Sequence, residues 1–206
     1  MLHDLTCHFP ADFATKIALR RVPLRSQKTA YTGMVFDYPV NSMDGSYIDF
    51  PGHIAETDDG RRADNVPADD FYRVPCTVIH LDRPSGAVGA DELSAACGGF
   101  PGTPALLLNA LGGHDCDQLP VRSTWLDDSA VEWLLASGIR LLVSDIYESP
   151  ELEGVFLKLF KSGICTVCEP RRMAAVKAPR VLLTISFLRR PELTQIPCQI
   201  LVEENE

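Results

Sequence analysis

A helix followed by a buried strand occurs twice in the second half of the chain, and this unit constrains the fold most. In the first copy, residues 126–146, apolar side chains recur with the helical period, Asp127 or Asp128 is the expected N-cap, and Gly138 is expected to end the helix. "IRLLVSDI" then predicts a buried strand. The second copy, residues 151–168, pairs "ELEGVFLKLFKSG" as helix with "ICTVCE" as strand. Alternating helices and strands predict an α/β fold.

The rest of the chain is richer in strands than in helices. One further helix is expected at 89–99, capped by Asp91 and ended by Gly98. Strands are expected within 28–42, 46–50, 76–81, 104–111, 180–188 and 197–204. We therefore predict a mixed β-sheet core with flanking helices. With 206 residues, 46% of them hydrophobic, the chain can form one domain over 1–206.

Charge and hydropathy exclude several classes of protein. A net charge of −9 argues against nucleic-acid binding, which needs a basic surface. The N-terminal residues lack the pattern of a signal peptide, and the apolar run 103–113 is far shorter than the roughly 20 residues of a membrane span. We expect a soluble, cytoplasmic protein that contacts no membrane.

Seven cysteines are scattered through apolar segments, so reduced and buried thiols are expected. Cys165 and Cys168 form a C-x-x-C pair inside a predicted strand. A spacing of three places the two side chains on opposite faces, which does not suit a zinc or redox pair. The cluster "HDCD" at 114–117 has metal-ligand residue types, but adjacent side chains diverge. A solvated loop is the simpler interpretation.

The segment "NSMDGSYIDFPGHI", residues 41–54, holds the clearest group of reactive side chains. Asp49 and His53 are close enough in sequence to share a hydrogen bond, which would make the imidazole more basic. The hydroxyl of Tyr47 is then a candidate donor to a carbonyl oxygen. The alternative is that packing and local hydrogen bonds alone retain these three residues.

Several segments, in order along the chain, resemble the cyclase/kynurenine formamidase (arylformamidase-like) family of metal-dependent hydrolases. These segments are "HDLT" (3–6), "MDGSYIDFPGH" (43–53), "YRVPCTVIHLD" (72–82), the stretch 125–150, "LFKSGICTVCEP" (159–170) and "IPCQILVEE" (196–204). The second is similar to the family signature H-x-G-T-H-x-D-x-P-x-H. The resemblance implies a swivelling β/β/α-like cyclase fold, a small-molecule substrate, a divalent metal (zinc or manganese), and a homodimer or homotetramer.

The resemblance also assigns roles to particular positions. In the family, two signature histidines and an aspartate bind the metal, and a third histidine is the catalytic acid and base. Here Met43 and Tyr47 stand at the first two histidine positions. A later family histidine should fall near Phe156 or Leu157, where this chain has none.

Four residues remain as candidates by this comparison. Asp49 and Glu169 are the candidate metal ligands, and His53 and Tyr47 are the candidate catalytic residues. A thioether suits copper(I), and a phenol binds a metal poorly unless it ionises from a pKa near 10. Zinc or manganese is therefore expected to bind weakly or not at all, whereas a hard ion held by two carboxylates and water stays open.

Two functions follow from this pattern. The first is a divergent hydrolase that acts on an amide, formamide or lactam C–N bond with a degraded metal site. The alternative is a non-catalytic member of the fold that binds a small molecule or has a structural role. Buried carboxylates are costly without partners, and Arg171 or Arg172 is expected to neutralise Glu169.

Overall fold

The computed structural model describes residues 1–8 and 16–204. Its strands are β1 (Leu2–Asp4), β2 (Ala18–Arg25), β3 (Ala30–Asp37), β4 (Tyr47–Asp49), β5 (Val74–His80), β6 (Gly86–Val88), β7 (Ala105–Asn109), β8 (Thr124–Leu126), β9 (Leu141–Ser144), β10 (Cys165–Cys168), β11 (Arg180–Phe187) and β12 (Gln195–Glu203). Its α-helices are α1 (Ala90–Cys97), α2 (Asp128–Ala136) and α3 (Val155–Lys161). No helix in the described ranges has the length and apolar character to cross a membrane.

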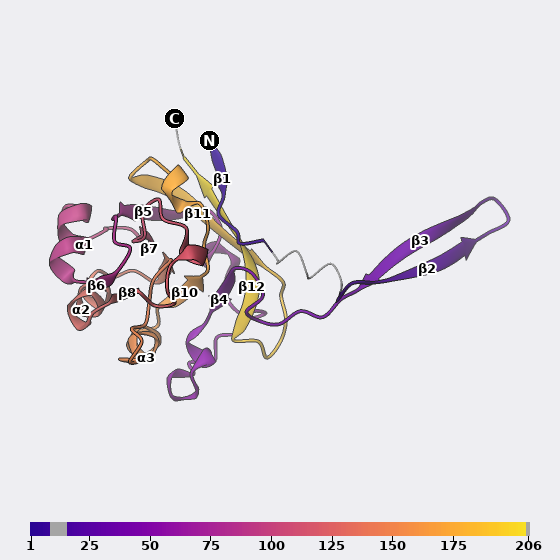
Figure 1. Cartoon of the computed structure of the whole chain (residues 1–206). Coiled ribbons are helices and arrows are strands. Elements are labelled where there is room, and N and C mark those ends of the chain that lie inside the picture. Colours follow the sequence, from indigo (N-terminus) through magenta and orange to yellow (C-terminus); the bar gives the residue numbers. More distant parts are fainter. Residues whose placement is uncertain (9–15, 205–206) are drawn as a thin grey trace.

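Eight strands form one sheet in the spatial order β1-β12-β11-β5-β7-β9-β10-β4. β4 also pairs with β12, so the sheet closes into a barrel (Figure 1). Within β4, Tyr47 lies opposite Cys168 of β10 on one side and Pro197 of β12 on the other. The predicted mixed sheet with flanking helices is therefore present, but its closure was not foreseen. It depends on a three-residue strand with partners far away in the sequence.

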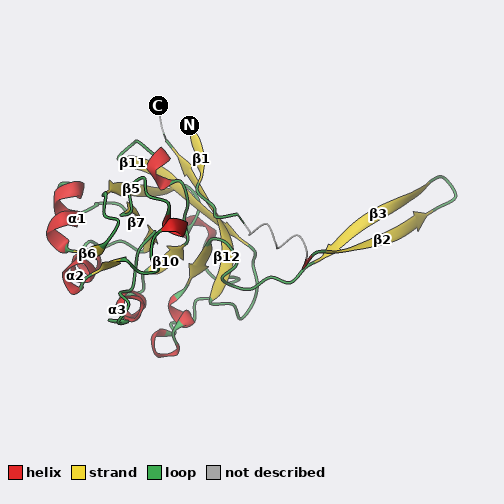
Figure 2. Ribbon diagram, in the orientation of Figure 1, coloured by secondary structure: helices red, strands yellow, loops and turns green. Residues whose placement is uncertain are grey.

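Two apolar layers pack on the two faces of this sheet. Along β7, Ala105 and Leu107 point into the barrel, whereas Leu106 and Leu108 point outward beneath the helices. α1, α2 and α3 lie together on this outer face (Figure 2). The same alternation sends Cys165 inward and Cys168 outward, as predicted, and the seven cysteines, all in described segments, form no disulfide.

The helix ends follow the predicted caps only in part. The Asp127 side chain accepts a 2.9 Å hydrogen bond from the Ala130 amide and caps α2, as expected. α1 begins at Ala90, so the prediction of Asp91 as its cap was wrong. The Ser129 hydroxyl accepts from the Ala90 amide instead. α3 begins only after Gly154, which has a φ of 80°, so residues 151–153, which were predicted to be helical, lie outside the observed helix.

Strands β2 and β3 form a separate two-stranded sheet that projects away from the barrel (Figure 1). We call residues 18–37 the arm. The strand pattern within 28–42 predicted β3, but β2 was not predicted, because "ALRRVPLR" shows no clear alternation and contains a proline.

Candidate functional site

A pocket of about 630 Å³ opens where several parallel strands end. β5, β7, β9 and β10 run parallel, so their carboxyl ends share one edge of the barrel. Ligands commonly bind at such an edge in α/β proteins. Side chains that line the pocket include Met43, Tyr47, Arg122, Asp145, Glu148, Phe156, Glu169 and Arg171. Of the four predicted site residues, this pocket therefore brings together Tyr47 and Glu169.

The approach to β4 is fixed by close backbone contacts. The Ser46 hydroxyl donates to the Glu169 carbonyl at 2.7 Å and accepts from the Cys7 amide at 2.7 Å. Gly45 has a φ of 70°, and a Cβ built there would lie 2.9 Å from the Cys7 carbonyl oxygen. These contacts hold the end of β4 against β10 at the edge of the pocket.

Tyr47 and Phe156 give the pocket an aromatic wall. Burial, with smaller contributions from Cys168 and Asp49, raises the pKa of Tyr47 well above its usual 10, so the phenol is neutral. The Phe156 ring stacks on Tyr147 at a centroid distance of 4.8 Å. Of the two residues predicted at the missing histidine position, Phe156 lines this pocket and Leu157 lines a different one. Met43 is 54% exposed at the rim.

Asp49 lies behind this wall and does not line the pocket. It is 3% exposed, and its Oδ2 accepts from the Cys168 thiol at 3.7 Å, while its Oδ1 has no hydrogen bond within the described segments. Burial raises the pKa of Asp49, and Gln195 and His53 partly offset this effect. The carboxylate is thus poorly placed to meet a ligand in the pocket.

His53 lies on a short 3-10 helix, Pro51–His53, and also stays outside the pocket. Its Nε2 is 3.4 Å from Nε2 of Gln195, and its ring meets Phe160 edge-to-face at 6.5 Å. No hydrogen bond between Asp49 and His53 is present in the part of the chain described. The pair proposed from the sequence is close, but it is not directly joined.

The Glu169 carboxylate pairs with an arginine and makes no contact with Asp49 in the described structure. Arg171 donates to the Glu169 carboxylate at 2.8 Å and to Asp117 at 3.0 Å, so one guanidinium bridges two carboxylates. The expected neutralisation by a following arginine is confirmed for Arg171. Arg172 instead donates to the backbone carbonyls of Asp4 and Thr6.

The pocket contains charged residues that the sequence reasoning missed. Asp145 accepts hydrogen bonds from the Ala110 and Leu111 amides at 2.9 and 3.1 Å, and burial raises its pKa to about 6. Glu148 accepts from the amides of Gly154 and Phe156 and so caps α3. The available signal was position, because Asp145 follows β9 directly at the carboxyl edge.

Arg122 was missed as well. It lines the pocket, and its backbone φ is 58°. Its side chain makes no hydrogen bond or ion pair with any described residue. Each of the pocket carboxylates has a partner within the chain, whereas this guanidinium has none in the described segments. Among the described residues, the pocket therefore presents one cation without a counterion.

The acidic loop beside the pocket is held by local contacts. Ligand atoms of Asp115, Cys116 and Asp117 lie within 4.8 Å of one another. Asp115, however, accepts from the Asp117 amide as a helix cap, Asp117 pairs with Arg171, and burial raises the pKa of Cys116 to about 11. His114 pairs with Asp82 at 3.0 Å. These contacts agree with the solvated-loop interpretation.

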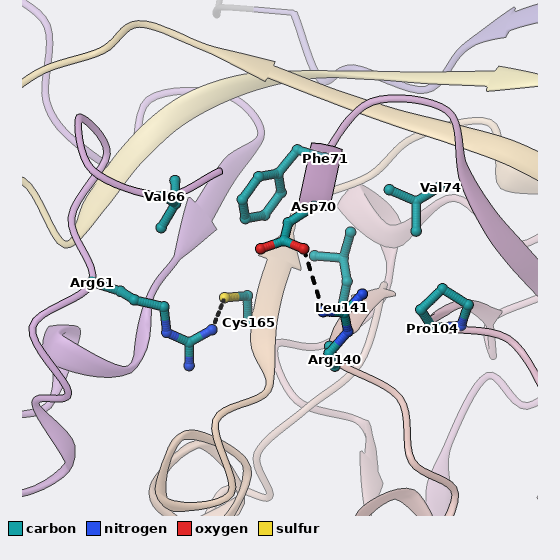
Figure 3. A pocket seen from close by; sticks show the side chains of 9 residues that line it. All are labelled: Arg61, Val66, Asp70, Phe71, Val74, Pro104, Arg140, Leu141 and Cys165. Atoms are coloured by element: carbon teal, nitrogen blue, oxygen red, sulfur yellow. Dashed lines mark hydrogen bonds and ion pairs between the residues drawn. The ribbon is translucent and has the colours of Figure 1, made fainter. Parts of the chain in front are cut away.

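A second pocket, lined by Arg61, Asp70, Arg140 and Cys165 among others, measures only about 50 Å³ (Figure 3). Arg61 donates to the Cys165 sulfur at 3.5 Å, and Arg140 pairs with Asp70 at 3.3 Å. Such a volume holds about one or two water molecules and is too small for an organic ligand. Burial raises the pKa of Cys165 to about 12, so its thiol is not a nucleophile.

Comparisons with known proteins agree on the fold. The family model described as "Putative cyclase" matches residues 4–149. Isatin hydrolase A from Labrenzia aggregata, solved with benzyl benzoate, has a TM-score of 0.72 at 14% identity, covering 100% of this chain and 94% of that chain. A protein from Bacillus stearothermophilus, described as a predicted metal-dependent hydrolase, has a TM-score of 0.68 at 18% identity, covering 98% and 97%. No curated protein matches significantly.

Proposed function

This chain belongs to the cyclase family, and we propose that it binds a small organic carboxylate in the pocket at the carboxyl edge of the barrel, without a catalytic zinc or manganese ion. The observation that carries the proposal is the set of donors at that edge. Met43 and Tyr47 stand where the family resemblance implies imidazoles, and Glu169 is bound by Arg171. What remains is a pocket of small-molecule size in which the Arg122 guanidinium has no partner among the described residues.

The donors do not fit a zinc or manganese ion. Such a site needs three or four nitrogen, oxygen or thiolate ligands that converge on one point. Tyr47 is neutral, Asp49 is enclosed with a raised pKa, and Glu169 already has a cation beside it. A metal held by Tyr47 and Glu169 would have to ionise the phenol and displace Arg171.

The lining of the pocket suggests the class of ligand. Its volume of about 630 Å³ lies within the range of small-molecule sites. Tyr47 and Phe156 offer an aromatic surface, and Arg122 offers a planar fork of donors that matches a carboxylate. An aromatic carboxylate satisfies both features.

The first test uses benzoate, with benzamide as the neutral control of the same shape. We expect benzoate, but not benzamide, to raise the melting temperature and to give a measurable dissociation constant by calorimetry. Arg122→Gln should weaken binding by about tenfold, the loss of one charge-assisted contact. Arg190→Gln, which changes an exposed arginine outside the pocket, should leave binding unchanged. Equal binding of both probes, or no effect of Arg122→Gln, would overturn the assignment.

The second test addresses the metal directly. Elemental analysis of the purified protein and titration with zinc should show no tight site. The triple variant Met43→His/Tyr47→His/Phe156→His restores three imidazoles around the same pocket, and it should gain zinc affinity if the missing donors are the reason. Stoichiometric zinc or manganese in the wild-type protein would disprove the proposal.

A second candidate is hydrolysis of an amide or formamide C–N bond without a metal, and Asp145 is the observation that favours it. A carboxylate with a pKa of about 6 suits a general base near neutral pH. Asp145 would take a proton from the attacking water, the new C–O bond would form as the C–N bond breaks, and the amine would leave with that proton. The neutral Tyr47 hydroxyl is able to donate to the carbonyl oxygen.

Formanilide hydrolysis tests this candidate. Turnover should survive a chelator, rise as the pH passes about 6, and be lost in Asp145→Asn. Turnover that the chelator abolishes and zinc restores would return the assignment to the metal-dependent mechanism. If benzoate binds and formanilide is not hydrolysed, only the binding function is supported.

A further inference from the structure

Asp145 is held at the edge of the pocket by two backbone amides of the turn that follows β7. We call this turn, residues 110–114, the β7 turn. The Ala110 amide donates to Oδ1 of Asp145 at 2.9 Å, and the Leu111 amide donates to Oδ2 at 3.1 Å. The carboxyl group cannot rotate without breaking one of these two hydrogen bonds. Because a carboxylate oxygen accepts more than one hydrogen bond, each oxygen can still accept from a ligand or a water molecule.

The start of the β7 turn is fixed by the segment that follows β5. The Leu81 amide donates to the Asn109 carbonyl at 2.8 Å, and the Arg83 amide donates to the Ala110 carbonyl at 3.0 Å. These two hydrogen bonds join the backbone at 81–83 to the end of β7. The position of the Leu81 backbone is therefore set by the barrel itself.

Gly112 allows the β7 turn to lie close to this segment. Its φ is 63°, and the turn is closed by a 3.1 Å hydrogen bond from the His114 amide to the Leu111 carbonyl. A Cβ at position 112 would lie 2.8 Å from both the Leu81 carbonyl oxygen and Oδ1 of Asp82. The Asp82 side chain is 80% exposed and can move aside, whereas the Leu81 carbonyl cannot. A side chain at Gly112 would therefore push the turn, and its two amides, away from this segment.

Charged side chains surround Asp145, but none in the described ranges forms an ion pair with it. Burial raises its pKa to about 6, and the influences that oppose burial are hydrogen bonds from the amides of Ala110, Leu111 and Asp145 itself. Tyr47 and Cys116, which line the same pocket, are neutral near this pH. The charged and imidazole side chains that line a pocket together with Asp145 are His8, His114, Asp115, Asp117, Arg122, Glu148, Glu169, Arg171 and Arg172.

We infer that Gly112 is a positioning residue for Asp145. Because it has no Cβ, the β7 turn lies against the Leu81 carbonyl and both amides reach the carboxylate. A role of Asp145 in binding or catalysis rests on the proposed function, whereas the hold of the turn on its carboxyl group does not. Since Asp145 lines the pocket that is proposed to take a carboxylate, the turn also sets the pH above which such a ligand is repelled.

The experiment follows the carboxyl carbon of Asp145 by NMR in the full chain labelled with ¹³C at aspartate, with Asp145→Asn to assign the signal. We expect a midpoint near pH 6 in the wild-type protein. Gly112→Ala should raise this midpoint by about one pH unit, the tenfold effect of losing one hydrogen bond to the charged form.

Gly113→Ala is the matched control. A Cβ at position 113 has no atom within 4 Å, so the midpoint of Asp145 should stay where it is in the wild-type protein. An unchanged midpoint in Gly112→Ala, or an equal shift in the two variants, would overturn the inference. A general loosening of the turn would give the second result.

A measurement on the wild-type protein keeps the inference testable if Gly112→Ala does not fold. The backbone N–H resonances of Ala110 and Leu111 should move with pH and share the midpoint of Asp145, because both amides donate to the group that ionises. Resonances that do not follow this midpoint would show that the turn does not hold the carboxylate.

Benzoate binding separates this inference from the proposed function. The dissociation constant of benzoate should rise about tenfold as the pH passes the midpoint of Asp145, because like charges repel in a partly buried pocket. Gly112→Ala should move this rise to the new midpoint. If benzoate does not bind at all, the proposed function fails, and the NMR titration still decides the role of Gly112. A benzoate affinity that follows another midpoint would contradict the effect of the turn on the ligand.

Discussion

The barrel and the arm are both made of antiparallel or mixed β-structure rich in apolar residues, yet they use those residues differently. Phe50, next to β4, is 0% exposed and meets Phe71 and Phe187 edge-to-face at 6.0 and 5.7 Å. Phe36, in the arm, is 53% exposed. The difference lies in what covers each strand. A barrel strand is covered by other parts of the chain, whereas the strands of the arm pair only with each other among the described segments.

The largest difference in unfolding free energy between the two regions is expected when one aromatic ring is removed from each. Phe50→Ala should lower the free energy of unfolding by about 3–5 kcal/mol, because it leaves a cavity in a packed core. Phe36→Ala should change it by less than about 0.5 kcal/mol, because the ring has few contacts to lose within the chain. Urea unfolding at submicromolar concentration measures both. A large loss in Phe36→Ala would show that the arm contributes to the stability of the barrel.

Glycine substitutions sharpen the same comparison at a smaller scale. Gly45→Ala should cost about 1–3 kcal/mol, because a positive φ and the nearby Cys7 carbonyl both oppose a Cβ. Gly33→Ala in the arm meets only Leu24 and Val22 at ordinary contact distances, so it should be neutral or slightly stabilising. Thermal unfolding of the two variants in parallel provides the measurement. Equal losses would mean that the arm is as tightly packed as the barrel.

One pH dependence of stability is expected in the barrel, at the buried carboxyl group of Asp145. Asp145 has a folded pKa of about 6 against an ordinary value of 3.8, so the folded state holds this proton more tightly than the unfolded state. Its stabilising contribution is full below pH 4 and is lost as the pH rises through about 6. The wild-type protein should lose about 2 kcal/mol more than Asp145→Asn between pH 4.5 and 7. Parallel pH curves for the two proteins would show that Asp145 is not the group responsible.

The smallest effect is expected for the ion pair of the arm. Arg20 and Asp37 lie 3.4 Å apart, with side chains 61% and 62% exposed. Exposed pairs contribute little, so Asp37→Asn should change the free energy of unfolding by less than about 0.5 kcal/mol. Urea unfolding at low and high salt checks this result. A larger loss would indicate that Asp37 has a partner that the monomer does not reveal.

The sequence predicted the strands that consist of short, continuous runs of apolar residues, because such runs indicate burial. "ALLLN" of β7, "LLVS" of β9 and "CTVC" of β10 are fully buried, and each was expected as a core strand. β2 was missed because its sequence shows no clear alternation and contains a proline. Barrel closure was missed because it depends on pairings between β4 and strands more than 110 residues away.

The site was predicted less completely than the fold, for a similar reason. The resemblance identified Tyr47, Asp49 and Glu169, but it could not show that Asp49 lies behind the pocket wall. Arg122 and Asp145 come from loops that follow other strands, and only the folded barrel brings them beside Tyr47. Their assembly depends on strand order, which no local pattern of residues encodes.

The brevity of β4 separates what the chain must keep from what it is free to change. Ile48 alone points into the barrel, while its two neighbours within the strand face the outer layer. The side chains of those neighbours can therefore be exchanged without altering the apolar layer inside the barrel, because the backbone of β4 makes the pairing with β10 and β12.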